Sequence, residues 1–293
     1  MPGDIATLYS TQFTSSLQLL SQQKLSRFEA TVSHGTYAGE KAQVVDHLGE
    51  TQAVERTTRN ADTPLIEVPY DTRFVQGSTF DWATLVDTDD KLKILADPVS
   101  SLPMACRAAL NRVKDDKLIA AFDGLAKAGK DGNALVAFPS TQEVLAATGS
   151  GNGMNFQKLL GAFEIFLKND VDLDGESLWC ALSPKQYLEL FPADAGLLTS
   201  GDFVTMKPVE TGRLGRVLNM QFIVSTRLVK VGNERKCFAY CESGMHLGTW
   251  KGQEGRVEQR ADKNYAWQVW GSETTGATRV EEKKVVRILC DET

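Results

Sequence analysis

A long polar segment in the first third of the chain places the strongest limit on its fold. Residues 51–95 alternate loosely between apolar and polar side chains, favour β-structure, and are interrupted by Pro64, Pro69 and Gly77. This pattern predicts a long two-stranded excursion. A two-stranded ribbon is only marginally stable in water. We therefore expect the segment to need a partner surface, with ion pairs among the contacts, because residues 50–95 carry nine acidic and five basic side chains.

The residues before this segment also lack a core of their own. Phe13, Leu17, Leu20 and Leu25 have a spacing that predicts a thin amphipathic helix over residues 10–25. Residues 33–50 are short polar runs with Gly and Tyr, which predict extended chain. Both segments are expected to pack against something outside themselves.

The rest of the chain predicts a mixed α+β fold. Asp97-Pro98 and Pro103 precede a long helical stretch from Leu102 to Ala128, and its two apolar stripes point in different directions. Its two halves should therefore pack against different partners. A second helix is predicted from Asn155 to Asn169, with Asn155 as its N-cap.

The C-terminal half predicts mainly strands. Residues 177–182 form a continuous apolar run, and Ser183-Pro184 then opens a short helix. Further strands are predicted at residues 217–225, at residues 236–241 and near the C-terminus. Strand and helix do not alternate regularly enough for a parallel Rossmann sheet.

Composition and charge exclude several classes of protein. The chain has 293 residues, of which 42% are hydrophobic, enough to build a core. No apolar run approaches the roughly 20 residues that span a bilayer, and the N-terminus lacks the pattern of a signal peptide. We expect no membrane association and an origin inside the cell. The net charge of −6 and the lack of a basic stripe argue against a nucleic-acid binder.

Two short motifs invite a ligand interpretation that their context does not support. Asp170, Asp172, Asp174 and Gly175 match the front of a calcium-binding loop, but the twelfth position falls on Ala181. An acidic turn after a helix is the favoured interpretation. The glycines at 149, 151 and 153 precede a helix without the Lys-Ser/Thr of a phosphate-binding loop, so a flexible linker is favoured.

Catalytic and metal-binding patterns are also missing. The five cysteines lie in apolar stretches and are expected to be reduced core thiols. The histidines, His34, His47 and His246, are scattered, so no zinc-site spacing results. We expect no catalytic residue, no metal and no cofactor. The alternative within the enzyme class would use His246 near Cys241.

The order of these parts resembles the major capsid proteins of tailed bacteriophages with the HK97 fold, and in particular a podovirus-like coat subgroup. The likeness covers most of the chain. It rests on the arm, the charged hairpin, the long helix after Asp97-Pro98, and the second helix. It rests further on three stretches: LWCALSPKQYLELF, GRLGRVLNMQFIVS and the C-terminal GATRVEEKKVVRILCDE.

The resemblance implies an α+β, HK97-like fold with a definite division. The segments would be an N-terminal arm at 1–49, an E-loop at 50–95, a peripheral domain with its spine helix at 96–175, an axial domain at 176–251, and return strands of the peripheral domain at 252–293. On the E-loop, Glu55, Arg56, Arg59 and Asp62 would form ion pairs between subunits.

The resemblance also implies a function. Many copies would assemble as hexamers and pentamers of an icosahedral shell around a double-stranded DNA genome, without sequence-specific DNA contacts. A separate scaffolding protein, a portal at one vertex and decoration proteins would be partners, and assembly in the host cytoplasm would place the protein in the virion. The lysine and asparagine that crosslink subunits in the namesake of the fold cannot be placed in this sequence by motif. An encapsulin-like cellular compartment and a soluble enzyme are the alternatives.

Overall fold

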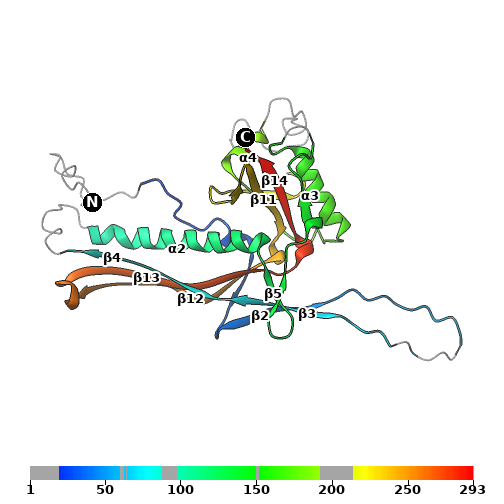
Figure 1. The fold of residues 1–293 in the computed structure, drawn as a ribbon, viewed down its shortest axis with the longest axis horizontal. Coiled ribbons are helices and arrows are strands. Elements are labelled where there is room, and N and C mark those ends of the chain that lie inside the picture. Colours follow the sequence, from blue (N-terminus) through cyan, green and yellow to red (C-terminus); the bar gives the residue numbers. More distant parts are fainter. Residues whose placement is uncertain are drawn as a thin grey trace.

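Three β-sheets and one long helix make up this computed structural model, which describes residues 20–59, 63, 65–87, 98–149, 152–191 and 214–292. Figure 1 shows α2 (Pro98–Asp123) running along the long strands of one sheet. A block that contains α3 (Phe156–Lys168) stands at one end of this layer, and a hairpin extends beyond that end. In the described part of the chain, no helix is both long and apolar enough to cross a membrane.

The first sheet lies beneath α2 and combines two strands from the first hundred residues with two strands from the C-terminal part of the chain. Its strand order is β1, β12, β13, β4, which have these bounds: β1 Ser33–Thr36, β12 Met245–Arg260, β13 Ala266–Arg279 and β4 Ser78–Val86. β12 and β13 form a long antiparallel hairpin, whereas β1 runs parallel to β12. Gly271 lets α2 approach closely, because a Cβ there would lie 2.3 Å from Cys106 Sγ.

The second sheet forms the compact block and holds the main core. Its central strand is β11 (Glu234–Cys241), with β14 (Val285–Asp291) on one side and β8 (Leu178–Leu182) on the other. The remaining strands are β7 (Glu143–Val144), β9 (Met220–Val224) and β10 (Lys230–Val231). Phe122 of α2 stacks on Phe238 at 4.7 Å between ring centroids and fixes the block to the helix.

The third sheet carries the extended hairpin. β2 (Lys41–Leu48) pairs antiparallel with β3 (Tyr70–Gln76), followed by β5 (Ala126–Ala128) and β6 (Ala134–Val136). The two-stranded excursion predicted within residues 51–95 therefore differs in its pairing. β3 pairs with the earlier β2, and β4 pairs with β13 of the first sheet.

The long helix is present, and its two halves pack differently, as predicted. Leu118 and Phe122 belong to the main core, whereas Cys106 and Leu110 lie against β13 at Gly271. The predicted end at Ala128 is wrong, because the helix ends at Asp123. The next residues form β5, whose backbone pairs with β3 and β6 and so gains hydrogen bonds that compete with the helix.

The second helix and the strand-to-helix turn are confirmed. The side chain of Asn155 accepts a hydrogen bond from Lys158 N at 2.8 Å and caps α3. Leu159, Ala162 and Phe166 form its buried face. Pro184 is the first residue of α4 (Pro184–Glu189), directly after β8.

The predicted N-terminal helix is wrong over the residues that the structure describes. Residues 10–19 lie outside them, and residues 20–28 are irregular. Residues 33–36 and 41–48 are extended, as predicted, but β1 finds its partner within the same chain. Polar side chains of α2 hold the backbone of the arm, which overrides the weak helical periodicity of residues 10–25.

Candidate assembly surfaces

A ribbon within residues 49–69, described for residues 49–59, 63 and 65–69, protrudes from the body of the protein. A backbone hydrogen bond of 2.7 Å from Gly49 N to Pro69 O closes its base. Beyond that bond, Val54, Leu65 and Ile66 expose 62%, 98% and 45% of their surface. Figure 1 shows the ribbon reaching away from the end of β2 and β3. The subunit leaves the apolar side chains of this ribbon in solvent.

The predicted contact residues lie on this ribbon as far as the structure describes them. Glu55, Arg56 and Arg59 are exposed, and Asp62 lies outside the described residues. Arg56 Nε donates to Thr58 O at 3.1 Å. No ion pair joins any of these three to another residue in the described ranges, so their charges face solvent in the single subunit.

A buried cluster of charges fixes the base of the ribbon to the body. Arg73 of β3 donates to Asp71 and, at 2.9 Å, to Glu282 Oε2. Glu282 Oε1 also lies 3.6 Å from Nε of Arg279, which is fully buried. Burial alone would raise the pKa of Asp71, but the hydrogen bond and charge of Arg73 lower it overall.

Arg279 extends this cluster into the body. Its guanidinium donates to Phe122 O and Gly124 O, both at 2.9 Å, and to Val136 O at 3.2 Å. It also lies over the ring of Phe138, with 5.3 Å to the centroid. One side chain therefore joins the end of α2, strand β6 and the end of β13. No local sequence pattern indicated this cluster, because Arg73 and Glu282 are 209 residues apart.

A second polar cluster holds the N-terminal arm along α2. Asp115 is fully buried and accepts hydrogen bonds from the backbone of Arg27 (3.1 and 3.2 Å) and of Phe28 (3.4 Å). Asn111 Nδ2 donates to Lys24 O at 2.8 Å. Phe28 and Val32 then enter the main core. The arm from residue 24 to 36 thus packs on its own subunit.

His246 fastens strand β1 to strand β12. Ser33 Oγ donates to Met245 O at 2.7 Å and lies 2.8 Å from His246 Nδ1, so Nδ1 carries the ring hydrogen. Tyr37 OH donates to His246 Nε2 at 2.9 Å. Burial lowers the pKa of His246 to about 4, and His34 adds to this effect.

The residues of the enzyme alternative do not form a nucleophile and base. Both ring nitrogens of His246 already have partners in Ser33 and Tyr37. Burial raises the pKa of the Cys241 thiol to about 12, so the thiol is protonated near neutral pH. All five cysteines are buried and unpaired, as predicted for core thiols.

The two ligand-like motifs form ordinary local structure where they are described. Asp172 Oδ1 accepts from the backbone N–H of Asp174 (3.2 Å) and of Gly175 (3.0 Å), which makes a tight acidic turn. Of the glycine loop, Gly149 and Gly153 are described and Gly151 lies outside the described residues. Among the residues described, no group of three or more His, Cys, Asp or Glu side chains could hold a metal ion.

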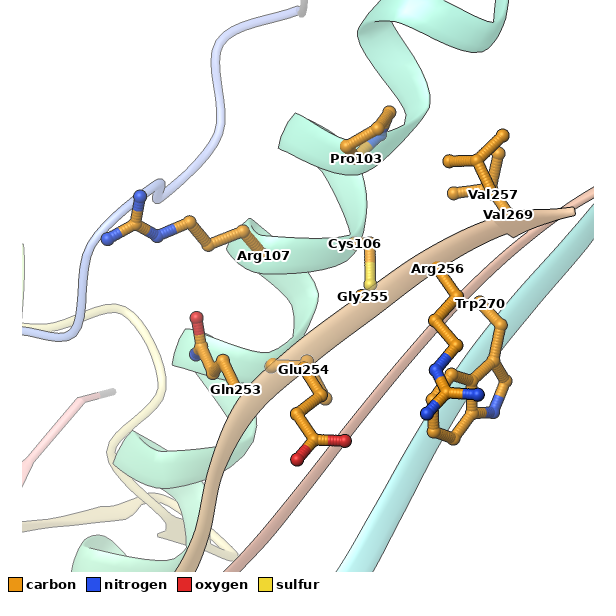
Figure 2. A pocket seen from close by; sticks show the side chains of 11 residues that line it. Pro103, Cys106, Arg107, Gln253, Glu254, Gly255, Arg256, Val257, Val269 and Trp270 are labelled. Carbon is orange, nitrogen blue, oxygen red and sulfur yellow. The ribbon is translucent and has the colours of Figure 1, made fainter.

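A groove separates the first half of α2 from β12. Its volume is about 370 Å³, and its lining includes Pro103, Cys106, Leu110 and Val257. Figure 2 shows Cys106 on the helix side of the strand, with Arg256 and Trp270 on its other side. A hollow of about 400 Å³ on that other side is lined by Lys251, Glu254, Arg256, Glu258, Gln268 and Trp270.

The fold as a whole is similar to that of solved phage capsids with the HK97-like architecture. The capsid structure of the cyanophage P-SCSP1u matches with a TM-score of 0.74 and 13% identity, covering 98% of this chain and 94% of that chain. The capsid of Ralstonia phage GP4 matches with a TM-score of 0.72 and 14% identity, covering 100% and 97%. The cyanophage Pam1 capsid matches with a TM-score of 0.73 and 10% identity, covering 98% and 97%.

The sequence itself assigns the family. The phage capsid protein family matches residues 5–292, so the chain belongs to that family. No curated protein matches the chain. Family and fold together identify a major capsid protein that forms the shell and resides in the virion capsid.

Proposed function

We propose that copies of this chain form the hexamers and pentamers of an icosahedral shell around the double-stranded DNA genome of a tailed phage. The observation that carries the proposal is the ribbon of residues 49–69. A backbone hydrogen bond closes its base, yet Leu65 exposes 98% and Val54 exposes 62% of its surface. A neighbouring copy that covers the ribbon removes this apolar surface from water.

The position of the ribbon favours closed rings. It projects from one end of an elongated subunit, whereas α2 and the long hairpin of β12 and β13 extend toward the other end (Figure 1). Head-to-tail contacts of this type generate rings when the rotation between copies closes. A small change of angle at the ribbon base separates a five-membered from a six-membered ring.

In the proposed rings, the charges of the ribbon meet a neighbouring subunit. Glu55, Arg56 and Arg59 are exposed and free of ion pairs with described residues, so they are open to pairing with a second copy. Asp62 belongs to the same proposed set. Exposed pairs contribute little each, about 0–1 kcal/mol, but they are repeated around the ring and suppress wrong alignments.

We further propose the division of the chain and its partners as the resemblance implies them. The arm (1–49), E-loop (50–95), peripheral domain (96–175), axial domain (176–251) and return strands (252–293) are the working units. A scaffolding protein, a portal and decoration proteins complete the particle, which assembles in the host cytoplasm. The net charge of −6 suits a shell that encloses DNA without adsorbing it.

We also propose that the protein has no enzymatic role. The buried, fully bonded His246 and the protonated Cys241 thiol support this statement.

Electron microscopy and sedimentation of the purified full chain test the proposal, with and without the phage's scaffolding protein. We expect round hollow shells much wider than a 32.1 kDa subunit. A chain that stays monomeric at high concentration under both conditions would overturn the proposal. Shells that package an enzyme instead of DNA in infected or expressing cells would favour the cellular compartment.

A further inference from the structure

One edge of strand β12 has no partner over most of its length. β1 pairs with β12 only from His246 to Thr249, and β13 occupies the opposite edge. No strand in the described part of the chain pairs with the outer edge of residues 251–260. Residues 254–259 are all exposed. An unpaired edge presents free backbone N–H and C=O groups that can accept another strand.

Hollows lie over both faces of this part of β12, so no described side chain packs tightly against it there. The groove of about 370 Å³ lies on the α2 side, next to Gly255 and Val257. The hollow of about 400 Å³ lies on the other side, next to Arg256 and Glu258. Figure 2 shows the strand passing α2, with Pro103 and Cys106 on the helix beside it.

The charges along the edge alternate in sign on one face. Glu254, Arg256, Glu258 and Arg260 are two residues apart, so their side chains lie on the same side of the strand. Trp270 and Gln268 of β13 lie on that side as well. The opposite side carries Gly255 and Val257, which face the groove.

This order of charges is complementary to itself in one arrangement. When two copies of β12 run antiparallel with Val257 opposite Val257, Arg256 lies opposite Glu258 of the second copy. Glu254 then lies opposite Arg260 of the second copy. Opposite charges at facing positions stabilise a pair of strands, whereas like charges destabilise it.

The neighbouring registers lose this complementarity. A shift of two residues in one direction places Arg256 opposite Arg256 and Glu254 opposite Glu258. The shift in the other direction places Glu258 opposite Glu258 and Arg256 opposite Arg260. A shift of one residue would turn the charged face of one copy toward the uncharged face of the other. Shifts of four residues keep two of the four Glu–Arg pairs within the strand, so the pattern favours the register with Val257 opposite Val257.

Arg256 and Glu258, the two charged residues next to Val257, are available for this contact. Arg260 already binds Asp262 at 2.5 Å, and Glu254 binds Lys251 at 2.8 Å. Arg256 and Glu258 form no ion pair with any residue that the structure describes. Around the twofold axis, two arginines and two glutamates of these positions would alternate in a ring of four charges.

The helices leave room for the contact. α2 packs mainly on β13, which becomes the second strand from the axis on each side. Three strand spacings then separate the two helices, about 14 Å, more than the roughly 8–10 Å between packed helices. The side chains that line the groove between α2 and β12 in each copy would occupy the space between the two helices.

We propose that two copies of this chain join through antiparallel pairing of residues 254–260 of β12, about a twofold axis at Val257. The proposal rests on the proposed shell and adds a homotypic contact between subunits that is separate from the ribbon.

Charge exchange within one strand tests the register. Arg256→Glu places two pairs of like charges across the axis and is expected to lower the yield of shells about tenfold. The double variant Arg256→Glu/Glu258→Arg restores opposite pairs and should restore the yield. Lys130→Glu, the same charge change on an exposed turn, serves as the control. Unchanged yield for Arg256→Glu, or a double variant no better than the single one, would overturn the contact.

Disulfide capture tests the axis directly and does not depend on yield. Val257→Cys in a Cys106→Ser background, which removes the thiol of the same groove, should give covalent dimers and no larger species when wild-type-like shells are oxidised with diamide. Gln259→Cys in that background is the control, because the two copies of position 259 would lie about 14 Å apart along the strands. Shells without dimers would overturn the contact and leave the shell intact, whereas absence of shells from the wild-type chain would overturn both.

Discussion

Glu282 lies between two arginines, with its Oε2 2.9 Å from Arg73 Nη2 and its Oε1 3.6 Å from Arg279 Nε. Arg73 belongs to β3, the strand that follows the ribbon. Arg279 is buried where the end of α2, β6 and β13 meet. This single carboxylate therefore links the strand at the base of the ribbon to the body of the subunit. Its position explains how a ribbon with so little core of its own can leave the subunit at a fixed angle.

Replacement of this carboxylate should destabilise the unassembled subunit. Glu282→Gln keeps the shape but leaves two buried guanidinium groups without its charge, and Arg73 keeps only Asp71. We expect the free energy of unfolding in urea to fall by about 2 kcal/mol. Glu281→Gln is the matched control, because its ion pair to Lys284 is more exposed, and it should change stability by less than about 0.5 kcal/mol. Equal effects of the two variants would contradict the role of Glu282.

Acid should weaken the attachment of β1 through His246. The folded-state pKa of about 4 is below the usual value of about 6.5, so the unfolded chain binds a proton that the folded chain does not bind between these values. Stability is therefore lost as the pH falls from about 6.5 to 4, by up to about 3 kcal/mol. His246→Gln keeps a polar side chain without this titration, and urea unfolding between pH 7 and pH 4 should show a flatter dependence. Identical slopes for variant and wild type would refute the assignment.

Removal of the cap on α3 should cost measurable stability. Asn155 accepts from Lys158 N at 2.8 Å and donates to Thr148 O at 3.0 Å. Asn155→Ala should therefore lower the free energy of unfolding by about 1–2 kcal/mol. Asn155→Asp retains the acceptor at the helix N-terminus and should recover most of the loss. Thermal unfolding followed by circular dichroism separates the two outcomes.

Charge reversal on the ribbon should affect assembly and leave the subunit intact. Arg56→Glu/Arg59→Glu changes two exposed side chains without ion-pair partners in the described structure, so its unfolding free energy should stay within about 0.5 kcal/mol of wild type. Shell yield, measured by sedimentation and microscopy, should fall at least about tenfold because the proposed intersubunit pairs become repulsive. Normal shells from this variant would exclude these arginines from the contact.

The sequence predicted correctly those elements that are stabilised by residues close to one another in the chain. The α3 helix follows from its apolar spacing and from Asn155, and both act within a few residues. The short helix after β8 follows from Ser183-Pro184 for the same reason. The apolar runs at residues 178–182, 236–241 and 285–289 became the buried strands of the second sheet.

The remaining elements depend on partners that are distant in sequence. Residues 126–128 continue the helical pattern of the sequence, but they form strand β5 because their backbone pairs with β3 and β6. Residues 20–28 are held by Asn111 and Asp115, more than 85 positions away. The same distance hides the cluster of Arg73, Arg279 and Glu282. The exposed ribbon was predicted only in part, because the predicted excursion also included residues 70–86, which pair with β2 and β13 in sheets of the body.

The parallel pairing of Ser33 with His246 has a consequence for biosynthesis. The two residues are 213 positions apart, and at about 5–20 residues per second a ribosome needs roughly 10–40 s to make the intervening polypeptide. During that time β1 lacks its partner β12, and β4 likewise lacks its partner β13. Nascent chains on crowded polysomes thus expose unpaired strands to one another. Pairing between the strands of two unfinished chains is therefore the route by which this topology favours aggregation during synthesis.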